Sequence, residues 1–154
     1  MLAQKLTSLL ERNRIHYKAL RHPPTYTAQD MASAMHVPGR EIAKAVVLEV
    51  DGKFAVAVLP ASRRVDLQRF REAAGAQSVS LAEEVEFRKL FLGCELGAEP
   101  PFGHLYGLPT WVDDSLAEDE FITFNGGSHE DAVRIRYEDF ARLAQPKVAR
   151  FARG

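Results

Sequence analysis

Two apolar segments that flank an Asp-Gly pair decide the fold: residues 42–60 read IAKAVVLEVDGKFAVAVLP. Both segments are rich in valine, whose branched side chain suits a pleated strand. The dipeptide Asp51-Gly52 favours a two-residue hairpin turn, because both central positions of that turn need a positive φ. The stretch therefore predicts two antiparallel strands, at 43–50 and 54–59.

Around this hairpin the sequence predicts helices and short strands in no regular alternation. Apolar residues at helical spacing predict helices at 2–12, 27–35, 62–74, 80–91 and 137–144. The second and fourth begin with capping-box sequences, at Thr27 and Ser80. Short strands are expected at 16–20, 110–112, 121–124 and 132–136. Because the elements do not alternate as in βαβ units, we expect an α+β fold with a mixed, mostly antiparallel sheet surrounded by helices.

The composition is that of one globular domain, at 1–154. Hydrophobic residues make up 46% of the chain, and 20 Lys and Arg against 21 Asp and Glu give a formal net charge of −1. This balance argues against a globally basic, DNA-binding protein. No run of 18 apolar residues is present to span a membrane, and the N-terminus lacks a signal-peptide pattern. A single cysteine, Cys94, is typical of a cytoplasmic protein.

Several enzyme classes leave no motif in the chain. The five histidines show none of the spacings of common zinc sites, and Cys94 has no cysteine near it, so no metal or cofactor is predicted. The P-loop of nucleotide hydrolases and the dinucleotide-binding fingerprint are both missing. So is the nucleophile elbow of serine hydrolases.

Lys44 is the most informative single residue. Side chains alternate between the faces of a strand, so Lys44 should share a face with the apolar residues Ile42, Val46 and Leu48. A lysine in that position either extends to water along its flexible stem or places a cation at the mouth of an apolar pocket. In the second case it is ready for a carbonyl, a carboxylate or a phosphate.

Two glycine-containing loops are further candidates. Residues 97–103 read GAEPPFG, in which prolines restrict the backbone and glycines permit close approach. This loop is either a rigid element whose N–H groups face a ligand, as in an oxyanion hole, or a surface connection. Residues 126–129 read GGSH and add a hydroxyl and an imidazole between two strands, unless they form an ordinary hairpin loop.

Cations without an intervening acid gather near the C-terminus, at Arg142, Lys147, Arg150 and Arg153. They either contact a phosphate backbone or complement the dipole of the last helix.

Taken in order, these motifs resemble the YbaK/prolyl-tRNA-synthetase-associated editing domains. Lys44 begins an Ala-Val-Val-Leu strand, the loop Gly97-x-x-x-Pro101-Phe102-Gly103 follows, and Asn125-Gly126-Gly127-Ser128-His129 comes last. The resemblance runs from about 16 to 143 and lies in the joint order and spacing of the motifs. It implies a strongly curved mixed sheet wrapped by helices, and hydrolysis of the ester bond of mischarged aminoacyl-tRNA by a freestanding domain that edits in trans.

The resemblance also implies a role for each motif. Lys44 and Gly97 are the expected catalytic residues: Lys44 holds the terminal adenosine phosphate or the aminoacyl carbonyl, and N–H groups near Gly97 hold the carbonyl or the water. The attacking water is assisted by the substrate's ribose hydroxyl, so no protein nucleophile is needed. The substrate-binding residues expected are Thr27, Pro101, Phe102, Gly103, Gly127, Ser128 and His129.

The sequence leaves open which amino acid is removed, which partners bind and whether the protein is an editing enzyme. The expected partner is mischarged aminoacyl-tRNA, and a tRNA synthetase or an elongation factor is a further candidate. Ala45 follows the lysine where some alanine-selective members carry a polar residue, so alanine, serine and other small amino acids all stay candidates. Two alternatives are a non-catalytic aminoacyl- or nucleotide-binding module that partners a synthetase, and a small-molecule esterase.

Overall fold

The computed structural model describes residues 1–154, with five α-helices, four 3₁₀ helices and ten strands. The α-helices are α1 (Gln4–Arg12), α2 (Ala28–Met35), α3 (Leu67–Ala74), α4 (Glu84–Phe87) and α5 (Tyr137–Ala144). The 3₁₀ helices are η1 (Gly39–Glu41), η2 (Arg88–Leu90), η3 (Gly103–Tyr106) and η4 (Asp114–Glu118). The strands are β1 (Lys18–Arg21), β2 (Ala43–Val50), β3 (Lys53–Pro60), β4 (Arg64–Val65), β5 (Val79–Leu81), β6 (Thr110–Asp113), β7 (Phe121–Asn125), β8 (Asp131–Arg136), β9 (Lys147–Ala149) and β10 (Ala152–Arg153). The longest α-helix has nine residues, so no helix has the length that crossing a membrane requires.

The strands form three sheets around the predicted hairpin. The largest has the order β5-β2-β3-β6-β9, in which β3 and β6 are parallel, as are β6 and β9. The antiparallel pair β2–β3 turns at Asp51 and Gly52, both with positive φ. A second, antiparallel sheet has the order β1-β8-β7, and β4 pairs with β10 in the third. The predicted α+β class with a mixed, mostly antiparallel sheet is confirmed.

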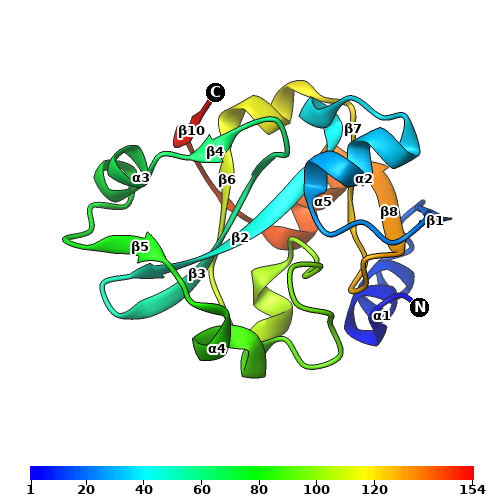
Figure 1. Ribbon diagram of the computed structural model, residues 1–154, viewed down its shortest axis with the longest axis horizontal. Helices are drawn as coiled ribbons and strands as arrows, with labels where there is room; N and C mark the ends of the chain where they lie inside the picture. Colours follow the sequence, from blue (N-terminus) through cyan, green and yellow to red (C-terminus); the bar gives the residue numbers. More distant parts are fainter.

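Strand β2 crosses the middle of the molecule and is covered on both faces (Figure 1). Ala43 and Val47 face the main core of 21 buried residues. Leu48, on the other face, packs in a second cluster with Phe70 of α3. Ile42 belongs instead to a third cluster beneath α2. Burial on both sides explains why residues 45–48 are all apolar rather than alternating with polar residues.

Two of the predicted helices begin later than expected. The helix expected from residue 80 is wrong in its first part, because Val79–Leu81 forms β5 and pairs along the edge of β2. Only the four residues of α4 are α-helical there, and η2 continues them. The helix expected from residue 62 begins at Leu67, because Asp66 caps it by accepting hydrogen bonds from the N–H groups of Gln68 and Arg69, at 3.1 and 3.0 Å.

The segment after α5 holds two strands that the sequence analysis missed. Strand β9 extends the main sheet, and β10 pairs with β4, so the chain ends beside the start of α3 (Figure 1). The buried carboxylate of Asp113 fixes this segment by accepting the N–H groups of Phe151 and Ala152, each at 2.8 Å. Helix α5 ends at Ala144, before Lys147, Arg150 and Arg153. These three cations therefore do not complement the dipole of the last helix, which was one of the two alternatives for them.

Candidate active site

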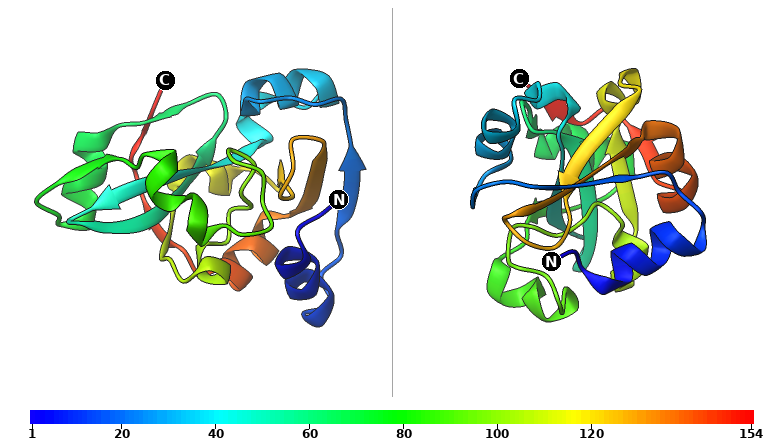
Figure 2. Two further views of the ribbon diagram at one scale, coloured as in Figure 1. Left: turned by 60° about the horizontal axis from the view of Figure 1, so that its bottom comes forward. Right: turned by 90° about the vertical axis from the view of Figure 1, so that its right-hand side faces the viewer.

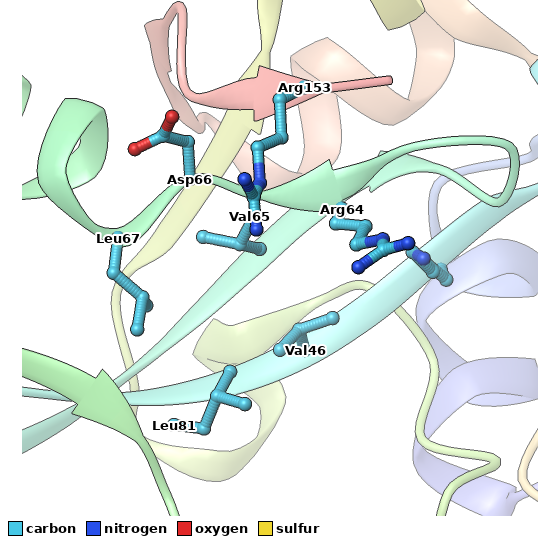
Figure 3. Close-up of a pocket in the computed structure, with 8 residues that line it drawn as sticks. Val46, Arg64, Val65, Asp66, Leu67, Leu81 and Arg153 are labelled. Carbon is cyan, nitrogen blue, oxygen red and sulfur yellow. The ribbon is translucent and has the colours of Figure 1, made fainter.

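Lys44 lies at the start of β2, at the edge of a cleft of about 530 Å³ that we call the Lys44 cleft (Figure 3). Its side chain shares a face with Val46 and Leu48, as the alternation predicted. The cleft is lined by Lys44, Val46, Arg64, Val65, Asp66, Leu67, Leu81 and Arg153. A cation therefore lines a partly apolar cavity.

The Lys44 ammonium has no acidic partner. Its one hydrogen bond is a long one, 3.5 Å from Nζ to the carbonyl oxygen of Ala61. Burial, and then the nearby Arg64 guanidinium, lower the pKa of Lys44 below its ordinary value of 10.5. The structure thus holds a half-buried positive charge that is poorly compensated by the protein itself.

Two arginines add to the positive charge of this cleft. The side chain of Arg64 extends from β4 over β2, and that of Arg153 descends from β10 toward Val65 (Figure 3). Neither forms an ion pair within 4.0 Å, in contrast to Arg150, which pairs with Asp114 at 3.2 Å. The acid in the cleft, Asp66, is turned away and occupied as the cap of α3 (Figure 3). The cleft is suited to an anion.

The remaining C-terminal cations are engaged elsewhere. Arg142 pairs with Asp139 at 3.0 Å, and Lys147 lies 5.2 Å from the ring of Trp111. Of the four, Arg153 alone lines the Lys44 cleft.

Thr27 lies in an adjoining cavity of about 470 Å³, the Thr27 cleft, which shares Lys44 and Arg64 with the first. Its hydroxyl accepts the N–H of Asp30 at 3.0 Å and so caps α2, as the capping box predicted. Thr27 was expected in the site from the family resemblance, and in the structure it lines the same cavity as Lys44.

Gly97 lies in a loop that is bound edge to edge to the turn between β7 and β8. The N–H of Glu95 donates to the carbonyl of Gly127 at 2.7 Å, and the N–H of Gly127 donates to Ala98 at 3.0 Å. The imidazole Nε2 of His129 is 2.7 Å from the carbonyl oxygen of Leu96. The two glycine-containing loops therefore form one unit.

The conformation of Gly97 requires glycine. Its φ is +86°, and a Cβ placed on it would lie 3.4 Å from Cε1 of His129. Its N–H already has a partner, because it donates to the Glu99 carboxylate at 3.1 Å. That carboxylate is buried, and burial raises the pKa of Glu99. The amide expected to hold the substrate carbonyl is thus occupied by a side chain from its own loop.

The segment that leads into α2 connects this unit to the Thr27 cleft. The N–H of Thr25 donates to the carbonyl of His129 at 3.1 Å, and the ring of Tyr26 lies 5.0 Å from the His129 ring. Thr27 follows directly and lines the cleft that contains Lys44. The exposed ring of Tyr26 is a further candidate contact for a substrate. Nothing in the sequence around it indicated such a role, because a single tyrosine shortly after two prolines forms no recognisable motif.

Ser128 and His129 point to different partners, as their positions in sequence predicted. The Ser128 hydroxyl donates to Asp131 at 2.6 Å and accepts the N–H groups of Glu130 and Asp131, at 3.2 and 3.1 Å. Gly127 is fully packed, since a Cβ there would come within 2.8 Å of the Cβ of Ala3. Ser128 therefore shapes the turn, whereas Gly127 contacts the Gly97 loop through its backbone and His129 through its side chain.

Three of the expected substrate-binding residues lie in the interior. Phe102 is fully buried in the main core, with its ring 5.6 Å from Phe124 and 5.5 Å from Phe140. The N–H of Gly103 donates to the Thr110 hydroxyl at 2.9 Å, and no side chain fits at that glycine. Pro101 is buried beside them. These three residues anchor the Gly97 loop, and they line neither the Lys44 cleft nor the Thr27 cleft.

Comparison with known sequences finds one family model and several relatives that match this chain. Residues 22–143 match the family model described as an aminoacyl-tRNA editing domain. A relative from Escherichia coli K12, the multifunctional Ser/Thr-tRNA deacylase ProXp-y, is 30% identical over 97% of this chain and 92% of its own length. A proline–tRNA ligase from Leuconostoc citreum is 22% identical over 84% of this chain, which corresponds to 23% of the ligase.

The fold is also similar to that of a solved structure. A solved structure of a candidate trans-editing enzyme for prolyl-tRNA synthetase superposes with a TM-score of 0.85 at 25% identity, over 99% of this chain and 97% of that one. The family model covers most of the chain, and the E. coli relative matches nearly all of it. The chain belongs to the YbaK-like family of aminoacyl-tRNA editing domains.

Proposed function

We propose that this protein hydrolyses the ester bond of mischarged aminoacyl-tRNA in trans, with the Lys44 cleft as the place where the acceptor end binds. The observation that carries the proposal is the cluster of Lys44, Arg64 and Arg153, which form no ion pair within 4.0 Å and line a partly apolar cavity. The 3′ end of tRNA combines a phosphodiester with an adenine, so it presents an anion and an apolar ring together.

The three cations act on the terminal phosphodiester in this proposal. Lys44 lines both this cleft and the Thr27 cleft and holds the phosphate by its charge, and the two arginines supply guanidinium groups that suit phosphate oxygens. Thr27, in the adjoining cleft, orients the ribose or the aminoacyl group. The aminoacyl ester then extends toward the Gly97–His129 unit.

Binding of the carbonyl at the Gly97 N–H displaces the Glu99 carboxylate. Glu99 accepts that N–H at 3.1 Å and is buried, so the exchange replaces one oxygen acceptor by another. An N–H group stabilises the ester most as the carbonyl oxygen gains negative charge in the transition state.

Water is the nucleophile, and the substrate's ribose hydroxyl assists it. The Ser128 hydroxyl is committed to Asp131, and the His129 ring is committed to Leu96, so no serine–histidine pair is available. Cys94 is half-buried, and burial raises the pKa of its thiol, with the Tyr106 hydroxyl at 3.1 Å. A thiol held in its neutral form is a poor nucleophile.

The amino acid removed is best sought among small side chains, beginning with serine and threonine. The E. coli relative is described as a Ser/Thr-tRNA deacylase and matches 97% of this chain, so seryl- and threonyl-tRNA are the first substrates to test. Alanyl-tRNA belongs in the same panel, because Ala45 is compatible with a small substrate. A synthetase or an elongation factor as a protein partner stays a prediction.

One assay separates the three candidate activities. The protein is incubated with a panel of mischarged tRNAs, with correctly charged tRNAs and with simple amino acid esters, and release of the amino acid is followed. Trans-editing predicts turnover of one or more mischarged tRNAs and little turnover of simple esters. Equal turnover of simple esters would indicate an esterase. Binding of tRNA without release from any of them would indicate a binding module.

A further inference from the structure

A second cationic cavity, which we call the basic pocket, lies at the C-terminal end of α2. It has a volume of about 500 Å³ and lies between the second sheet and the end of α2. Figure 1 and the left view of Figure 2 show β1 and β8 side by side near α2, at the opposite end of the molecule from α3. Its charged and imidazole residues are Lys18, Arg21, His22, His36, Glu41 and Arg134.

Two cations of this pocket stand directly opposite each other. Lys18 of β1 pairs with Arg134 of β8 in the antiparallel register, and Thr123 of β7 follows across the sheet. Like charges at opposed positions destabilise a sheet. Neither Lys18 nor Arg134 has an ion pair within 4.0 Å, and the neighbour of the Arg134 guanidinium is the ring of Phe121, 4.5 Å away. Both side chains are exposed, and the register places two positive charges on neighbouring strands without an ion pair, which suits an anionic ligand.

The other charged groups of the pocket offset this positive charge only in part. Arg21 is neutralised by Glu130, at 2.9 Å, and by Asp131, at 3.5 Å. Glu41 is the carboxylate among the lining residues, and it forms no ion pair within 4.0 Å. Nε2 of His22 is buried without a hydrogen-bond partner. Because Nδ1 of His22 donates to the Pro23 carbonyl at 2.8 Å, Nε2 of the neutral ring is an acceptor that lacks a donor, and it does not itself favour an anion.

Surface depressions connect the basic pocket to the site proposed for the ester. A cavity beside α2 shares His36 with the basic pocket and Gln29 and Ser62 with the Thr27 cleft. The Thr27 cleft in turn contains Lys44. A nucleic acid whose 3′ end occupies the Lys44 cleft can therefore follow the surface around α2 to Lys18 and Arg134.

We propose that the basic pocket binds a backbone phosphate of the tRNA, upstream of the 3′ end. The inference rests on the proposed function, because it takes the Lys44 cleft as the place of the terminal nucleotide. Lys18 and Arg134 supply the positive charge, and binding a phosphate between them relieves their mutual repulsion. The contact is to the backbone and carries no preference for the bases.

The experiment compares Lys18→Gln and Arg134→Gln with the control Lys53→Gln, a lysine that is also exposed on a strand but lies at the turn of the β2–β3 hairpin. Affinity for uncharged tRNA is measured at several salt concentrations, and thermal midpoints are recorded for each variant. Deacylation is compared on charged full-length tRNA and on the same amino acid esterified to a CCA trinucleotide.

The proposal predicts that each pocket variant binds uncharged tRNA about fivefold more weakly and that the slope of log affinity against log salt falls by about 1. The preference for full-length tRNA over the trinucleotide falls by a similar factor. The thermal midpoint of Lys18→Gln does not fall, because a repulsive pair has been removed.

Unchanged tRNA affinity in both pocket variants would overturn the inference, as would an equal loss in Lys53→Gln. A loss of affinity that follows a loss of thermal stability would also overturn it, because the residues would then be structural. Competition of free inorganic phosphate with tRNA for the wild-type protein at equal phosphate concentration would show a small-anion site and contradict backbone binding. Failure of the proposed function looks different: the wild-type protein would then deacylate neither substrate, while the binding measurement still decides the role of the pocket.

Discussion

Replacing Lys44 by methionine should separate activity from stability. Methionine keeps an unbranched apolar side chain in the lining of the cleft but removes the charge. In the folded protein the ammonium makes one long hydrogen bond, 3.5 Å to the Ala61 carbonyl, and no ion pair. A hydrogen bond of that length contributes little, and the half-buried charge itself is unfavourable, so the free energy of unfolding should stay the same or rise slightly.

The effect on deacylation should be large. A hydrogen bond to a charged group is worth about 1.5–3 kcal/mol, which corresponds to roughly a ten- to hundredfold loss in kcat/KM if Lys44 holds the phosphate or the carbonyl in the transition state. The assay is release of the amino acid from mischarged tRNA by wild-type protein, Lys44→Met and the control Lys53→Met, with thermal melts of the same preparations. A folded Lys44→Met that works at the wild-type rate would refute the reasoning.

The same charge makes the activity dependent on pH. Burial and the Arg64 guanidinium lower the pKa of Lys44 below 10.5, so the ammonium loses its proton at a lower pH than a free lysine does. Activity should therefore decline on the alkaline side, and Arg64→Gln should move the titration of Lys44 to higher pH. NMR titration of the Lys44 ε-methylene group measures this directly. A midpoint that does not move in Arg64→Gln would show that the two charges do not interact.

Three further results are expected. Gly97→Ala should lower the thermal midpoint, because a non-glycine residue at a φ of +86° costs about 1–2 kcal/mol, and should lower the deacylation rate by more than that loss explains; melts and rates that both match the wild type would contradict this. Arg153→Gln should raise KM for tRNA and flatten its salt dependence, whereas Arg150→Gln, whose partner is Asp114, should change both much less; equal effects would remove Arg153 from the cleft's function. Cys94→Ala should be nearly silent and Ser128→Ala should keep part of the activity, and intact mass spectrometry after rapid quench should detect no acyl group on the protein; an acyl adduct would establish a covalent mechanism.

The parts of the fold that local chemistry determines could be predicted from the sequence. The β2–β3 hairpin follows from two valine-rich runs around Asp51-Gly52, and the start of α2 follows from the Thr27 cap. The capping box at Ser80 misled, because residues 79–81 gain more by pairing with the open edge of β2 than by starting a helix. Strands β9 and β10 are too short to show a pattern, and they form because distant partners, β6, β4 and Asp113, bind their backbones.

The candidate site was predictable only one residue at a time. Lys44 stood out because a cation on an apolar strand face conflicts with burial, and the structure places it as expected. The neighbours Arg64 and Arg153 are 89 residues apart in sequence and meet only because β4 pairs with β10. The occupation of the Gly97 amide by Glu99 likewise depends on how the loop folds back on itself, which no spacing rule indicates.

The most direct test of the central claim is a single-turnover reaction of the wild-type protein, in excess, with seryl- or threonyl-tRNA in which the tRNA is mismatched to the amino acid. We predict that the amino acid is released well above the uncatalysed rate and that Lys44→Met slows this release by roughly ten- to a hundredfold. A complex that forms with the charged tRNA but leaves the ester intact across the panel, alanyl-tRNA included, would contradict the account.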